Sequence, residues 1–285
     1  MRSRPELRAG TRAVSSLQNE RVKLIRSLEM RKARRETGLF VAEGASLLLT
    51  ARAAGWVPKI LVFLAGRQGE VASELARWAE SAGAECLEVS AAVLAKLAGK
   101  DNPQNMLGVF EQRWASLPDA RAAPGSALWV ALEAPRDPGN LGTIVRTSEA
   151  VAASGVMLIG HSCDPYSREA VRASMGSIFN VPVVRLEAQP FLAWRAAWRG
   201  DVVGTHLEAG VDFRQAGYRA PLLLVMGSEG PGLSGELARA CSRLVKIPMA
   251  GRLDSLNLAV ASALMLYEMR KDRLRLDGTP PRSRS

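Results

Sequence analysis

Residues 221–232 read PLLLVMGSEGPG, an apolar run of strand type that ends in a glycine-rich loop with one carboxylate, Glu229. Apolar strands that end in flexible loops are where α/β proteins place ligands, because glycine lets backbone N–H groups approach a ligand closely. Two further stretches have the same form, NLGTIVR at residues 140–146 and IPMAGRLDSLN at residues 247–257. The three stretches together predict ligand-binding loops at strand ends.

Strand-like and helix-like segments alternate along most of the chain. Six predicted strands, ALWVALE, GVMLIG, VPVVRL, DVVGTHL, PLLLVMG and RLVKIPM, are followed by a closing helix predicted from Leu256 to about Arg273. This pattern predicts an α/β fold with a largely parallel sheet, helices on both faces and ligand sites at the carboxyl ends of the strands. A smaller α/β domain precedes it.

The predicted domain boundaries follow changes in composition. Residues 1–112 form a basic arm and the smaller α/β domain, and residues 126–273 form the larger domain. Residues 113–125 contain two prolines and a glycine without periodicity, which is typical of a linker. Residues 274–285 end in DGTPPRSRS and are predicted to be a disordered basic tail.

The formal net charge of +10 is concentrated at the two ends of the chain. Residues 1–35 hold 11 Lys or Arg against 3 acids, and residues 270–285 hold 6 against 2. Clustered cations attract polyanions by neutralising phosphates and releasing counterions, so nucleic acid is the favoured partner. Within a basic helix predicted over residues 16–35, the candidate RNA contacts are Arg31, Lys32, Arg34 and Arg35. A solvated helix face is the alternative.

Several other classes of protein lose support. No apolar run approaches the roughly 20 residues of a membrane span, and the N-terminus lacks the apolar core of a secretory signal, so a cytoplasmic protein is expected. The cysteines (Cys86, Cys163, Cys241) and histidines (His161, His206) show no disulfide framework or metal-ligand spacing. No metal site is expected. No GxGxxG follows the first strand of the larger domain, and the P-loop and GxSxG signatures do not occur.

Each conspicuous polar residue has two interpretations when taken alone. Arg146 lies within two turns of the start of its predicted helix, where a guanidinium could hold a phosphate or carboxylate, or form a surface ion pair with Glu149 or Glu133. Glu229 could act on a substrate or cap the following helix. Ser255 could be functional, an N-cap serine, or both.

Considered together, the three stretches resemble the SpoU family of RNA ribose methyltransferases, which includes the TrmH-like enzymes. The resemblance rests on N-x-G-x-x-x-R at residues 140–146, G-S-E-G-x-G at 227–232 and I-P-M-x-G-x-x-x-S-L-N at 247–257. Order and spacing agree, and the resemblance covers residues 126–273. The basic arm and GLFVAEG also resemble the substrate-binding domain, with a ribosomal-protein-L30-like fold, that often accompanies this family.

The resemblance implies a fold, a cofactor and a set of residue roles. The larger domain is expected to carry a deep trefoil knot, to bind S-adenosylmethionine in it and to form a homodimer with the active site at or near the interface. The implied cofactor-binding residues are Gly227, Ile247 and Leu256. The implied catalytic residues are Arg146, Glu229, Ser255 and Asn257, and Asn140 is expected to contact the substrate.

The implied reaction is methyl transfer to a ribose 2′-hydroxyl of RNA, with ribosomal RNA favoured over tRNA. A guanidinium holds its proton firmly and is a poor proton acceptor, so we expect Arg146 to hold an RNA phosphate and favour the developing alkoxide. The alternatives are a non-catalytic RNA-binding or ribosome-assembly factor that retains the fold, a tRNA 2′-O-methyltransferase, and a base methyltransferase.

Overall fold

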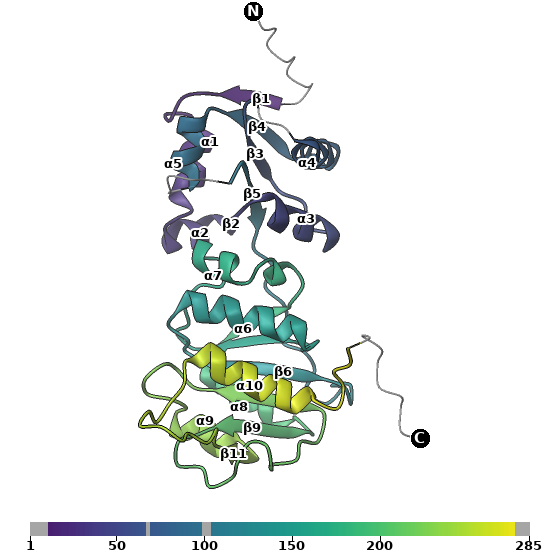
Figure 1. Ribbon diagram of the computed structural model, residues 1–285, viewed down its shortest axis with the longest axis vertical. Helices are drawn as coiled ribbons and strands as arrows, with labels where there is room; N and C mark the ends of the chain where they lie inside the picture. Colours follow the sequence, from purple (N-terminus) through teal and green to yellow (C-terminus); the bar gives the residue numbers. More distant parts are fainter. Residues whose placement is uncertain (1–10, 67–68, 99–103, 277–285) are drawn as a thin grey trace, which may run out of the picture. The chain divides into compact units, whose positions relative to one another are not determined.

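The computed structural model describes residues 11–66, 69–98 and 104–276 (Figure 1). The chain folds into two compact units, each with its own sheet. Met1–Arg113 and Asp164–Phe179 form the first unit, and Trp114–Cys163 and Asn180–Ser285 form the second. The α/β fold class predicted from the sequence is confirmed.

The sheet of the first unit has five strands in the order β1-β4-β3-β5-β2. They are β1 (Thr11–Val14), β2 (Leu39–Glu43), β3 (Ile60–Leu64), β4 (Glu85–Val89) and β5 (Met106–Glu111). β1, β4 and β3 run parallel, whereas β5 is antiparallel to both of its neighbours. β1 is a short edge strand within the basic arm, and its backbone pairs with β4.

The helices of the first unit include two in the basic N-terminal region. These two are α1 (Glu20–Ser27) and α2 (Arg31–Thr37). The other helices of this unit are α3 (Ala45–Ala53), α4 (Glu70–Ser81), α5 (Ala91–Ala98), α7 (Arg168–Ala173) and the 3-10 helix η1 (Ser177–Phe179). Apolar side chains from α1, α5 and the sheet form a buried core, which includes Ile25, Leu94 and Val109.

The structure corrects the prediction of one basic helix over residues 16–35, because a turn separates α1 from α2. Met30 is extended at the start of α2. The Nη1 atom of Arg34 donates to the carbonyl oxygens of Leu28 and Glu29, both at 2.8 Å. These two acceptors would bond to backbone N–H groups in a continuous helix, so the guanidinium stabilises the break.

The sheet of the second unit has six strands, all parallel, in the order β11-β9-β10-β6-β7-β8. They are β6 (Leu128–Glu133), β7 (Gly155–Ile159), β8 (Val183–Leu186), β9 (Asp201–Thr205), β10 (Leu222–Met226) and β11 (Arg243–Val245). All six predicted strands and their parallel arrangement are confirmed. β10, the strand of PLLLVMG, lies between β9 and β6 and is buried along its length.

Helices cover this sheet. They are α6 (Pro138–Ala150), α8 (Ala188–Ala196), α9 (Gly235–Ala240) and α10 (Leu258–Arg270). Phe191 and Trp194 of α8 and Leu237 of α9 pack into one buried cluster with side chains of the sheet. α6 and α10 pack against each other, and Figure 1 shows them side by side. α10 begins at Leu258, two residues later than predicted.

One difference concerns the predicted domain boundaries. The prediction assigns all of residues 126–273 to the larger domain. The structure places Asp164–Phe179 in the first unit, because side chains of this segment pack against aromatic residues of that unit. The other boundaries stay predictions. The described residues of the predicted linker, 113–125, form no helix or strand, and most of the predicted tail lies outside the described residues.

Candidate active site

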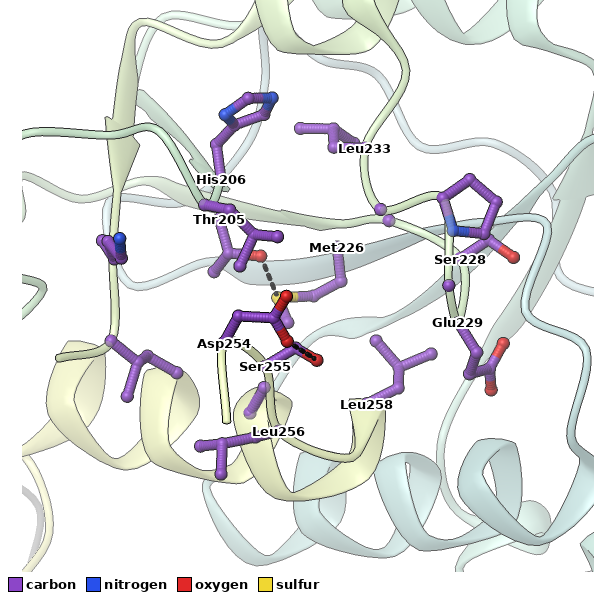
Figure 2. A pocket seen from close by; sticks show the side chains of 18 of the residues that line it. Thr205, His206, Met226, Ser228, Glu229, Leu233, Asp254, Ser255, Leu256 and Leu258 are labelled. Carbon is purple, nitrogen blue, oxygen red and sulfur yellow. Dashed lines mark hydrogen bonds between the residues drawn. The ribbon is translucent and has the colours of Figure 1, made fainter. Parts of the chain in front are cut away.

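A cavity of about 770 Å³ lies where β9, β10 and β11 end (Figure 2). Gly227, Ile247 and Leu256, the three cofactor-binding candidates, all line it. The catalytic candidates Glu229, Ser255 and Asn257 line it as well, but Arg146 and Asn140 do not. The structure therefore brings the second and third sequence stretches to one pocket.

Gly227 allows the loop after β10 to fold back on itself. A Cβ atom on Gly227 would lie 2.0 Å from the carbonyl carbon of Gly232 and 2.0 Å from the nitrogen of Leu233. The loop is closed by two backbone bonds, from Ser228 N to Gly232 O at 3.1 Å and from Gly232 N to Ser228 O at 3.0 Å. Glycine at 227 is thus required by the loop itself, whatever ligand it contacts.

Glu229 binds the turn that precedes α6. Its carboxylate accepts from the backbone N–H of Arg136 at 2.9 Å, from that of Asp137 at 3.4 Å and from Nδ2 of Asn140 at 3.0 Å. Partial burial favours the neutral acid, but these hydrogen bonds outweigh it and lower the pKa of Glu229 from its ordinary value of 4.5. Glu229 is held as a carboxylate that organises a loop.

Asn140 and Asn257 extend this arrangement to the third stretch. Nδ2 of Asn257 donates to Oδ1 of Asn140 at 2.9 Å. Oδ1 of Asn257 accepts from the backbone N–H groups of Ala259 and Val260, at 2.9 and 3.3 Å, so Asn257 caps α10. The side chains of Glu229, Asn140 and Asn257 thus form one hydrogen-bonded chain that joins all three stretches.

Ser255 is exposed, and it is not the N-cap, because Asn257 takes that position. The Ser255 hydroxyl donates to Oδ1 of Asp254 at 3.2 Å, and Figure 2 shows both side chains beside the cavity. The N-cap interpretation of Ser255 is therefore corrected. Its hydroxyl lies on the loop that lines the pocket.

Arg146 stands apart from this network. It is exposed on α6, and within the described residues its side chain makes no hydrogen bond or ion pair. Glu149 instead accepts from Asn180 at 2.6 Å, and Glu133 accepts from the backbone of Ser234 at 2.7 Å. Six residues of helix correspond to about 9 Å of rise and roughly 240° of rotation, so Arg146 faces a different side of α6 from Asn140.

The cavity also contains residues that the sequence analysis does not single out as ligands. Thr205 and His206 follow β9, and the Thr205 hydroxyl donates to Sδ of Met226 at 3.5 Å. Asp254 lines the cavity as well, and Figure 2 shows its side chain. The sequence does contain a pattern that could have indicated Thr205 and His206. In DVVGTHL an apolar strand is followed directly by polar residues, as in the three stretches above.

The four basic candidates on α2 separate into two groups. Arg31, Lys32 and Arg35 are exposed. Arg34 is buried, and its Nε atom pairs with Oδ2 of Asp164 at 2.8 Å. A buried, paired guanidinium cannot meet an RNA phosphate on the surface, so the structure argues against Arg34 as an RNA contact.

Two other kinds of feature are absent from the described residues. Across residues 11–66, 69–98 and 104–276, no group of three or more His, Cys, Asp or Glu could hold a metal ion. In the same ranges, no helix is both long and apolar enough to cross a membrane.

The lining of the cavity suits a ligand with apolar, polar and cationic parts. Its volume of about 770 Å³ falls within the roughly 300–1,000 Å³ of small-molecule pockets. Met226, Leu256 and Leu258 provide apolar surface, and the carboxylates of Glu229 and Asp254 provide negative charge. S-adenosylmethionine, with a flat aromatic base, a polar ribose and a positive sulfonium, fits this lining.

The fold and the cavity define an α/β protein that holds a small-molecule ligand at the carboxyl ends of a parallel sheet. Residues 127–267 match the SpoU rRNA Methylase family, and residues 19–108 match the MRM3-like substrate binding domain. The chain is 31% identical over 285 residues to the 23S rRNA (uridine(2479)-2′-O)-methyltransferase of Streptomyces viridochromogenes, with 96% of each chain covered.

A second relative and a solved structure support the same family. The chain is 29% identical over 258 residues to the 23S rRNA (guanosine(2553)-2′-O)-methyltransferase RlmP of Bacillus subtilis, covering 90% of this chain and 98% of the relative. The crystal structure of AdoMet-bound rRNA methyltransferase from Sinorhizobium meliloti matches with a TM-score of 0.86 and 42% identity, covering 94% of this chain and all of that one. The chain belongs to the SpoU rRNA methylase family, as its motifs predict.

Proposed function

We propose that this protein transfers a methyl group from S-adenosylmethionine to a ribose 2′-hydroxyl of ribosomal RNA. The observation that carries this proposal is the hydrogen-bonded chain of Glu229, Asn140 and Asn257, which joins the three family motifs beside the cavity. As a SpoU family member the protein is a methyltransferase, and its cofactor is S-adenosylmethionine. Two relatives that match over most of the chain are named for nucleotides of 23S rRNA, which favours rRNA over tRNA here.

The cavity residues would hold the cofactor largely through backbone groups. Gly227, Ile247 and Leu256 line the cavity from two loops, so their backbone groups would be the ones that meet a ligand there. When bound, S-adenosylmethionine supplies an electrophilic methyl group on a positive sulfonium. Glu229 and Asp254 would favour that positive charge in the pocket.

The polar residues around the cavity would position the ribose. Glu229 orients Asn140 and the turn at Arg136, and Asn257 fixes the start of α10. Ser255 and Asn257 would hold the ribose with its 2′-oxygen in line with the reacting methyl group. Glu229 bonds the turn before α6, so we assign it to holding this loop.

Arg146 would act on the RNA backbone. An exposed guanidinium without a protein partner among the described residues is available to hold a phosphate bidentately. Its positive charge would also stabilise the alkoxide that develops on the ribose oxygen, while the phosphate or a water accepts the proton. Arg31, Lys32 and Arg35 would contribute phosphate contacts that are independent of base sequence.

A second copy of the chain would complete the site. On α10, Val260, Leu264 and Tyr267 expose 49%, 41% and 51% of their surface at helical spacing, and they line a groove that continues to Asn140 and Asn257. Because the groove continues to site residues, we propose that it is the homodimer interface. A partner there would explain why Arg146 lies away from the cavity of its own chain.

Two further proposals rest on family membership. We propose that the segments carrying the second and third motifs form a trefoil knot, supported by the central position of β10 between β9 and β6. We also propose a cytoplasmic location, supported by an rRNA substrate. A crystal structure and fractionation of cell extracts would test these two proposals.

The function is tested by methyl transfer from labelled S-adenosylmethionine to rRNA and tRNA, comparing the wild type with Arg146→Ala. Nuclease digestion and mass spectrometry should place the methyl group on a ribose of rRNA. Inactivity of the wild type on both RNAs, or full activity of the variant, would contradict the proposed mechanism. A methyl group on a base would indicate that the protein is a base methyltransferase.

A further inference from the structure

The segment Asp164–Phe179 is built into the first unit, although it lies inside the stretch that matches the SpoU rRNA Methylase family. The ring of Tyr166 lies 4.7 Å from that of Phe40, and the ring of Phe179 lies 5.2 Å from those of Trp56 and Phe110. Rings at these separations are in the range of favourable aromatic pairs. The segment is thus part of the unit that carries the basic helix α2.

A buried ion pair joins this segment to α2. Nε of Arg34 lies 2.8 Å from Oδ2 of Asp164, and the two side chains are only 6% and 9% exposed. Oδ1 of Asp164 accepts from the backbone N–H of Tyr166 at 2.9 Å. The same guanidinium bonds the carbonyl oxygens of Leu28 and Glu29, so one side chain ties the end of α1, α2 and the segment together.

Arg34 is the one buried side chain of α2. A helix of seven residues has little stability of its own, so its direction depends on the contacts that anchor it. A second ion pair, from Nε of Arg168 to Oε2 of Glu29 at 2.6 Å, holds the preceding turn to the same segment. The direction of α2 is therefore set by residues about 130 positions further along the chain.

We propose that Asp164 is a positioning residue for RNA binding, which holds Arg34 and thereby directs Arg31, Lys32 and Arg35 of α2 toward the RNA backbone. The inference rests on the proposed function, because it takes α2 as an RNA-binding element. Without the Asp164 carboxylate the buried positive charge of Arg34 is no longer neutralised, which is costly enough to draw the guanidinium toward water and turn α2 with it. The three exposed cations are then no longer aligned with the phosphates of the RNA.

The test measures the affinity for purified bulk rRNA by filter binding at several salt concentrations, together with S-adenosylmethionine binding by calorimetry. Asp164→Asn keeps the size of the side chain and removes its charge. We expect RNA affinity to fall on the order of tenfold and its salt dependence to flatten, because phosphate contacts set that slope. S-adenosylmethionine affinity should stay within about twofold, since Asp164 does not line the cavity.

The decisive comparison introduces Asp164→Asn into a variant that already lacks the three cations (Arg31→Ala, Lys32→Ala, Arg35→Ala). If Asp164 acts through α2, this fourth change should cause little further loss of RNA affinity. A full additional loss in that background would overturn the inference. A matched control is Glu74→Gln, which breaks the exposed Arg52–Glu74 pair of the same unit and should bind RNA like the wild type.

Arg34→Lys provides a second variant in case Asp164→Asn does not fold. It keeps a cation beside Asp164 but loses the planar fork that reaches the two carbonyls, so RNA binding should weaken in the same direction. Wild-type RNA binding by folded Asp164→Asn or Arg34→Lys would overturn this inference alone. Failure of the wild type to bind or methylate rRNA would overturn the proposed function as well.

Discussion

Asn257 donates a hydrogen bond from Nδ2 to Oδ1 of Asn140 at 2.9 Å, across 117 positions of sequence. Asn140 in turn donates to Glu229 at 3.0 Å, so its amide has an acceptor on one side and a donor on the other. This double bonding fixes which way the Asn140 amide points, and it links the turn before α6 to the cap of α10.

Replacing Asn140 should impair catalysis more than folding. Asn140→Ala removes both bonds, and misplacement of the loops is expected to lower kcat by roughly 100-fold. The loss of stability should be about 1–2 kcal/mol, since each hydrogen bond contributes modestly. Single-turnover methylation and urea unfolding measure the two effects. Thr147→Ala, which removes a hydroxyl bonded to the Thr143 carbonyl on the same helix, is the matched control. Equal losses in both variants would contradict the role of Asn140.

Gly227→Ala should disrupt the loop that lines the cavity. The new Cβ would meet the backbone of Gly232 and Leu233 at 2.0 Å, and such overpacking typically costs about 1–3 kcal/mol. We expect a lower Tm and much weaker S-adenosylmethionine binding by calorimetry. Gly125→Ala is the control, because nothing lies within 4 Å of the added atom. Unchanged cofactor affinity in Gly227→Ala would show that the loop can move without affecting the site.

Glu229→Gln should reduce stability in a pH-dependent way. The pKa of Glu229 is lowered below 4.5 in the folded protein, so its stabilising contribution is present above that pH and is lost as the pH falls through the folded value. The wild type should therefore be more stable than the variant at neutral pH, and the difference should shrink on acidification below 4.5. Urea unfolding at pH values on both sides of 4.5 measures this. A difference that persists undiminished in acid would refute the charge-based account.

Leu264→Asp should dissociate the proposed homodimer. A carboxylate on the apolar face of α10 would have to be buried against the second copy without a partner. Sedimentation analysis is expected to show a monomer with little methyltransferase activity. Val211→Asp, which places the same charge on another exposed apolar residue of the second unit, should leave the oligomeric state unchanged. If the wild type is already monomeric and active, the dimer proposal fails.

Removing the three exposed cations of α2 should weaken RNA binding. In the variant with Arg31→Ala, Lys32→Ala and Arg35→Ala, we expect the slope of log affinity against log salt to fall by roughly 0.7–0.9 for each phosphate that the protein no longer neutralises. Filter binding with rRNA at several salt concentrations measures this slope. An unchanged slope would mean that these residues form only a solvated helix face.

The sequence predicts the strands and the loops of the site well, because both signals are local. An apolar run such as residues 222–226 marks a buried parallel strand, and glycine after it marks a close backbone turn. The partners of the polar side chains are not local. The motif implies that Asn257 is a catalytic residue, but the structure also makes it the N-cap of α10, a role that the sequence left open for Ser255.

The basic helix α2 is a second case in which the sequence does not reveal the partner of a side chain. Arg34 and Arg35 are adjacent and chemically identical, yet one is buried and the other exposed. Charge content alone indicates a nucleic-acid-binding region and cannot separate the two. The carboxylate that buries Arg34 comes from Asp164, in a segment that sequence boundaries assign to the other domain.

The sequence by itself determined the α/β class, the six parallel strands of the larger unit and the family, because periodicity, glycine positions and motif spacing are properties of short stretches. Only the tertiary structure decided that Glu229 organises a turn, that Asn140 and Asn257 bond, and that Arg34 is buried against Asp164. Those pairs are 89, 117 and 130 residues apart. Such pairings arise from how the elements pack together, which no local pattern records.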